Sequence, residues 1–123
     1  MKITLPSDCG NAPRIGIVSD FVVSWAKNDE DAVATWLSDS TSWSEVGGDT
    51  YQGSDIAESL RPVFTPEHVE VLSVVTHGRL AACDGYFEAD GVRVHFSHMF
   101  RFASTAKTAR IADIRTYAIE TRD

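Results

Sequence analysis

Two ionisable side chains in apolar stretches of the sequence are candidates for proton-transfer chemistry. His98 is flanked by Phe96 and Phe100 at intervals of two residues. A strand over 92–103 would therefore place these side chains on one apolar face. An imidazole in such surroundings is desolvated and tends to be neutral, so it could polarise a carbonyl oxygen or carry a proton. The other open interpretation is a core histidine satisfied by a backbone carbonyl or by Glu45.

Glu45 is the second candidate. Residues 40–47 alternate weakly and predict a strand in which Glu45 shares a face with Trp43. A carboxyl group beside an aromatic ring has a raised pKa, which suits a general acid or base. An equally supported interpretation is that Glu45 is a solvated side chain near the mouth of a pocket. If both side chains point inward, Glu45 and His98 form a dyad in which each stabilises the charged form of the other.

The other candidates for a pocket wall are aromatic or small apolar side chains, namely Trp43, Cys83, Phe87, Phe100 and Tyr117. Cys83 has no flanking base or helix N-terminus, so it is interpreted as a small apolar residue and not as a nucleophile. The histidines show no metal-ligand spacing, and no phosphate-binding loop of the P-loop type occurs. We expect neither a metal nor a cofactor.

Length and charge limit the function classes. A chain of 123 residues fits one domain, here 13–123, preceded by a loose N-terminal arm over 1–12. The formal net charge of −7, with no basic run, argues against nucleic acid or anionic membrane as a partner. No apolar stretch approaches the roughly 20 residues that span a bilayer, and the N-terminus lacks the apolar region of a signal peptide. Two cysteines do not form a disulfide framework. We therefore expect a cytoplasmic protein.

The hydrophobic period changes along the chain and indicates the fold class. A spacing of three and four from Ile15 to Trp25 predicts an amphipathic helix, and a short second helix follows to about residue 37. Ser54 could cap a third helix. The period then becomes two in four predicted strands, 69–77, 79–89, 92–103 and 110–120. We expect an α+β fold in which a cone-shaped, curved antiparallel or mixed sheet wraps round the N-terminal helices and leaves an apolar pocket at the open end.

The outward face of this sheet is predicted to contact another protein. It would carry a mixture of apolar and cationic side chains: Tyr86, Arg93, His95, Met99 and Arg101. Such a mixture is typical of protein interfaces. We expect a homodimer formed through this outer sheet face.

Three segments of the sequence resemble the nuclear-transport-factor-2-like (NTF2-like) superfamily, and within it the SnoaL-like and ketosteroid-isomerase-like group. They are FVVSWAKNDEDAVATWLSDSTSW, then SEVGGDTYQGSDIAESL, and last HMFRFAS followed by ARIADIRTY. The resemblance covers nearly the whole chain from about Pro13. It implies the cystatin-like α+β barrel of that group, in which isomerases, cyclases, hydrolases, dehydratases and non-catalytic binding domains all occur.

The resemblance also implies roles for particular residues. Ketosteroid isomerases use an aspartate base with an oxyanion hole made of a tyrosine and a protonated aspartate. Glu45 falls at the position of the base, His98 at that of the protonated aspartate, and Phe21 at that of the tyrosine. Phe21 is thus a ligand-contact candidate without the hydroxyl group. Limonene-epoxide-hydrolase-like members place an aspartate late in the last strand, and here that position is Thr116.

Three functional hypotheses follow. The first is a cofactor-independent enzyme of isomerase, lyase or hydrolase type, acting on a small apolar carbonyl compound, with Glu45 moving the proton and His98 polarising the oxygen or returning the proton. The second is a non-catalytic domain that binds a small apolar ligand or serves in assembly. The third is a purely structural dimerisation module with a filled pocket.

Overall fold

A computed structural model describes residues 1–6, 13–53, 56 and 62–122 of the chain. The described residues form two helices and seven strands, which are β1 (Lys2–Thr4), α1 (Pro13–Ala26), α2 (Glu30–Ala34), β2 (Ser42–Glu45), β3 (Thr50–Gln52), β4 (His68–His77), β5 (Leu80–Ala89), β6 (Val92–Phe102) and β7 (Ile111–Arg122).

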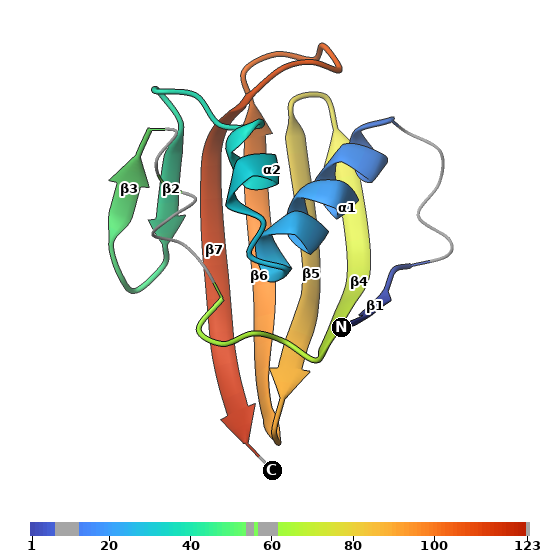
Figure 1. Ribbon diagram of the computed structural model, residues 1–123. Coiled ribbons are helices and arrows are strands. Elements are labelled where there is room, and N and C mark those ends of the chain that lie inside the picture. Colours follow the sequence, from blue (N-terminus) through green and yellow to red (C-terminus); the bar gives the residue numbers. More distant parts are fainter. Residues whose placement is uncertain (7–12, 54–55, 57–61, 123) are drawn as a thin grey trace.

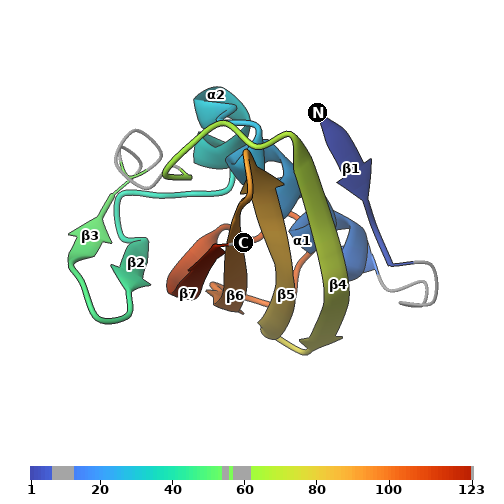
Figure 2. The same ribbon diagram turned by 90° about the horizontal axis from the view of Figure 1, so that it is seen from below.

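The strands form one curved sheet in the order β1-β4-β5-β6-β7-β2-β3. Neighbours are antiparallel except β1 beside β4 and β2 beside β7, which are parallel. Both helices lie across the same face of the sheet (Figure 1), and seen from below the sheet bends round them (Figure 2). The expected α+β fold, with a curved mixed sheet wrapped round the N-terminal helices, is confirmed.

Helix α1 is held to the sheet by the apolar stripe that its sequence predicts. Val18, Phe21, Val22 and Trp25 recur at intervals of three and four and are all buried. The helix begins at Pro13, whose missing N–H costs nothing in a first turn. It ends before Asn28, which adopts a left-handed backbone conformation with φ of 62°.

The long strands alternate between the two faces of the sheet as expected. On β5 the side chains of Ala81, Cys83 and Phe87 are buried, whereas Asp84 between them is exposed. The turn between β5 and β6 has positive φ at Asp90 (53°) and Gly91 (78°), as a two-residue hairpin turn requires. The predicted strands 79–89 and 92–103 are therefore joined as a tight hairpin.

One irregularity interrupts β4. The register with β5 shifts between Val71 and Ser73, and Leu72 is 49% exposed. Gly85 of β5 pairs with Val71 at this bulge, and a Cβ atom added to Gly85 would run into the backbone of Glu70. A glycine is therefore needed where the bulged strand approaches its neighbour so closely.

Three expectations differ from the structure or lie outside it. The N-terminal arm is not loose throughout, because Lys2–Thr4 forms β1 beside β4. Thr50–Gln52, for which the sequence predicts no strand, forms β3 against β2. The third helix was expected from Ser54, and that segment lies outside the described residues except for Ile56, whose side chain is buried.

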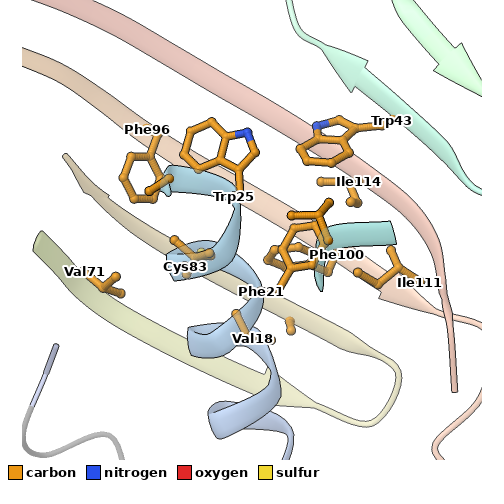
Figure 3. Packing of buried hydrophobic residues seen from close by; sticks show 14 of the residues in the cluster. Val18, Phe21, Trp25, Trp43, Val71, Cys83, Phe96, Phe100, Ile111 and Ile114 are labelled. Carbon is orange, nitrogen blue, oxygen red and sulfur yellow. The ribbon is translucent and has the colours of Figure 1, made fainter. Parts of the chain in front are cut away.

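The core lies between α1 and the concave face of the sheet. Figure 3 shows Phe21 of α1 packed beside Phe100 of β6 and Ile114 of β7, and Trp25 beside Trp43 at one end of the cluster. The rings of Phe21 and Phe100 meet edge to face, with their centroids 5.5 Å apart. Most of the aromatic side chains that were predicted to line a pocket are therefore buried in the hydrophobic core.

Candidate functional site

A small cavity opens at the end of the core that is closed by the two tryptophans. Its volume is about 70 Å³, and it opens to solvent between β2, β7 and the segment that follows residue 61. The described residues that line it come from α1, β2, β5, β6, β7 and that segment: Trp25, Trp43, Glu45, Pro62, Val63, Phe87, Val94, Thr116 and Ala118. The walls are therefore largely apolar, with Glu45 as the carboxylate at the rim.

Strand register brings the two catalytic candidates into one row on the concave face. Glu45 of β2 pairs with Thr116 of β7, and Thr116 pairs with His98 of β6. Trp43, two residues before Glu45, is buried, so Glu45 points to the same face of its strand. The row places Thr116 between Glu45 and His98.

A buried chain of hydrogen bonds passes through Thr116. The Nε1–H of Trp43 donates to Oγ1 of Thr116 at 2.8 Å, since an indole nitrogen can only donate. Nδ1 of His98 lies 2.8 Å from the same hydroxyl oxygen. A hydroxyl group can donate and accept, so it bridges the indole and the imidazole: it accepts from Trp43, and it donates to Nδ1 of His98 or accepts from it according to which ring nitrogen carries the proton.

His98 is neutral in this environment. Its side chain is completely buried, and burial lowers its pKa to about 3. The ring packs edge to face on Trp25, with centroids 4.7 Å apart. Within the described part of the chain, its Nε2 atom has no hydrogen-bond partner. The expectation of a neutral histidine is confirmed.

Glu45 and His98 do not form the expected dyad in which each stabilises the charged form of the other. The imidazole bonds to Thr116, and desolvation alone accounts for the lowered pKa of His98, with no opposing contribution from a carboxylate. Glu45 is exposed at the pocket rim instead of lying beneath an aromatic lid. The side chain of Thr116 lies between the carboxylate of Glu45 and the imidazole of His98.

The predicted wall residues divide into three groups. Trp43 and Phe87 line the cavity. Phe21, Cys83 and Phe100 are core residues, at most 3% exposed, and they do not appear among the lining residues that the structure describes. Tyr117 is 46% exposed and follows the buried Thr116, so it points to the outer face and the prediction that it reaches the pocket is wrong.

Cys83 behaves as a small apolar residue. It is 3% exposed, and desolvation raises the pKa of its thiol to about 12. A thiol in this state is not a nucleophile near neutral pH.

Sequence reasoning missed two features of this site. Thr116 enters the sequence analysis only as the place of an absent carboxylate, and its position opposite His98 depends on the face of β7 that meets the core and on the register of β6 with β7. The wall formed by Trp25 and Val63 depends on how α1 and the segment after residue 61 meet the sheet. No local pattern in the sequence carries that information.

A larger hollow, of about 400 Å³, lies beside the turn between β5 and β6. It is polar, and part of its charge is paired. Arg93 bonds to Glu88 at 2.7 Å, and Glu88 also contacts Nδ1 of His68 at 3.2 Å. Because pockets for small molecules have mostly apolar walls, the smaller apolar cavity is the better candidate site despite its size.

The part of the chain that the structure describes holds no metal site or membrane span that would be a further candidate. Among the described residues, no group of three or more histidine, cysteine, aspartate or glutamate side chains is placed to hold a metal ion. Neither α1 nor α2, the helices of the described ranges, has the length and hydropathy to cross a membrane.

Comparison with known proteins shows the fold. No protein-family model and no curated protein sequence matches the chain. An NTF2-like protein of unknown function from Burkholderia xenovorans superposes with a TM-score of 0.73 at 16% identity, covering 90% of this chain and 85% of that one. The chain therefore has the NTF2-like fold.

Two further solved structures differ in function. An LEH-like epoxide hydrolase of M. tuberculosis has a TM-score of 0.62 at 21% identity, with coverage of 87% and 83%. A SnoaL-like protein from Shewanella denitrificans, described as a polyketide cyclase candidate, has a TM-score of 0.68 at 10% identity, with coverage of 85% and 88%. At these identities the likeness concerns the fold, and function has to be argued from the site.

Proposed function

We propose that the protein binds a small apolar molecule in the cavity between Trp25, Trp43 and Phe87. The observation that supports this proposal is a solvent-open cavity with largely apolar and aromatic walls and one carboxylate at its rim. An engineered cavity that holds benzene has a volume of roughly 150 Å³. A cavity of about 70 Å³ therefore takes only a small end of a ligand, and the rest lies in the opening.

Titration with butan-2-one, observed by NMR of the isotope-labelled chain, tests the proposal. The indole N–H signals of Trp25 and Trp43 should move together as the ligand binds. Trp36 does not appear among the described lining residues and is the internal control. Ala118→Phe at the cavity wall should abolish the shifts, whereas Ala103→Phe, at an exposed loop position, should not. Shifts of equal size in both variants would contradict binding in this cavity.

Glu45 supports a second candidate function, proton transfer on a carbonyl ligand. It is the ionisable side chain among the described lining residues. Its carboxylate would take a proton from the carbon next to the carbonyl group, leaving an enolate, and return the proton to another atom of the conjugated ligand, so that a double bond moves without gain or loss of atoms. His98, neutral and bonded to Thr116, would position that hydroxyl group and would not itself carry the proton.

Hydrogen exchange measures this activity directly. In deuterated water, the wild-type protein should exchange the hydrogens next to the carbonyl of butan-2-one faster than the Glu45→Gln variant does. Asp20→Asn is the matched control, since Asp20 is exposed on α1 and its replacement removes the same charge. Equal exchange by wild type and Glu45→Gln would leave binding as the function and reject catalysis.

We also propose that two copies of the chain associate through the outer face of the sheet. Tyr117 and Ile119, which are neighbours on the outer side of β7, expose 46% and 69% of their surface, and Val75 of β4 exposes 62% on the same face. The two exposed apolar side chains on β7 support a contact at this part of the face. Light scattering should give twice the mass of the chain, and Ile119→Lys should give a monomer. Val46→Lys, which introduces the same charge at an exposed apolar position after β2, should remain a dimer.

A further inference from the structure

The polar groups of the cavity do not suit the carbonyl compound that the sequence suggests. A carbonyl oxygen needs a hydrogen-bond donor. The indole N–H of Trp43 is already bonded to Thr116, and the hydroxyl group of Thr116 also bonds to His98. Glu45, when ionised, can only accept. The carboxylate of Glu45, an acceptor, is therefore the polar group that the described lining residues offer to a ligand.

The walls and the charge of the protein favour a cation. The rings of Trp25, Trp43 and Phe87 line the cavity and suit the alkyl part of a ligand, while Glu45 at the rim suits a positive end. None of the described lining residues is cationic. The net charge of −7 further favours the approach of a positive ligand and disfavours an anionic one.

We propose that the ligand of this cavity is a small protonated amine, whose alkyl group enters between the aromatic rings and whose ammonium group lies against the carboxylate of Glu45. This inference rests on the proposed binding function and names the class of ligand for the same cavity. The alkyl end has to be small, because the cavity holds only about 70 Å³. The ammonium group remains at the rim, where Glu45 is exposed and the group stays partly hydrated.

Four ligands that differ chiefly in their polar end test the proposal: butylammonium, butan-1-ol, butan-2-one and butyrate. Each is titrated into the isotope-labelled full chain at equal ionic strength, with the indole signals of Trp25 and Trp43 as the readout and Trp36 as the control. Butylammonium should bind about three- to fivefold more tightly than butan-1-ol, the range of one solvent-exposed ion pair. Its advantage should shrink in about 0.5 M salt, which screens such a pair.

Replacement of the carboxylate completes the test. Glu45→Gln should reduce the ratio of butylammonium to butan-1-ol affinity to near one, whereas Asp20→Asn should leave that ratio unchanged. Butan-2-one or butyrate binding as tightly as butylammonium would overturn the inference while leaving the binding function in place. An unchanged ratio in Glu45→Gln would overturn it too. If none of the four ligands moves the signals of Trp25 and Trp43, the binding function itself has failed.

Discussion

Replacing Thr116 by valine removes the hydroxyl group that joins Trp43 to His98 while nearly conserving the volume of the side chain. The Nε1–H of Trp43 and Nδ1 of His98 then lose partners that each lie 2.8 Å away. A buried polar group left without a partner costs about 1–3 kcal/mol. We therefore expect Thr116→Val to lower the free energy of unfolding by about 2–5 kcal/mol, a large part of the total for a domain of this size.

Urea unfolding of matched variants measures this loss. Thr116→Ser keeps the hydroxyl group and loses one methyl group, so it should cost only about 1 kcal/mol. Thr121→Val makes the same chemical change at an exposed position of the same strand and should alter stability by less than about 0.5 kcal/mol. The double variant His98→Leu with Thr116→Val should lose less than the sum of its parts, because two partners of one bond disappear together. A Thr116→Val variant no less stable than Thr116→Ser would refute the hydrogen-bonded chain.

Two further predictions concern pH and glycine. Burial lowers the pKa of His98 to about 3 from an unfolded value of 6.5. Between pH 6.5 and pH 3 the unfolded state therefore binds more protons than the folded state. The contribution of His98 to stability is present above pH 6.5 and is lost as the pH falls toward 3. Wild type should lose about 2 kcal/mol more than His98→Leu between about pH 7 and pH 5 in urea titrations, and parallel curves would refute it. Gly16→Ala should raise the melting temperature. A Cβ atom meets nothing within 4 Å at this position, and alanine is favoured over glycine in a helix by about 1 kcal/mol. Gly85→Ala should lower it sharply because of the collision with Glu70, and equal effects of the two variants would contradict the close approach at the bulge.

The periodicity of the sequence fixes which residues share a face, and this was predictable. The apolar stripe from Val18 to Trp25 and the alternation around His98 are local properties, because side-chain direction follows from a period of 3.6 or of two. The hairpin at Asp90 and Gly91 is equally local, since few residues tolerate positive φ. His98 alternates with the apolar residues of β6, so its burial and neutrality are predictable from that strand alone.

Short strands and cross-sheet distances were not predictable in this way. β1 and β3 have three residues each, too few for a period, and they exist because a neighbouring strand supplies their hydrogen bonds. Tyr117 was assigned to the pocket, although its direction depends on which face of β7 meets the core. That choice is made by the packing of Ile114 and Thr116, not by Tyr117 itself.

The sequence by itself determined the α+β class, the side chains that share a face of a helix or strand and the chemical types available to a pocket. The tertiary structure decided that Thr116 lies between Glu45 and His98, because the parallel pairing of β2 with β7 joins residues 71 positions apart in the chain. It also decided that Glu45 lies at the rim and His98 in the core. Whether two polar groups meet depends on the register and curvature of a sheet assembled from distant segments, and no local period encodes that distance.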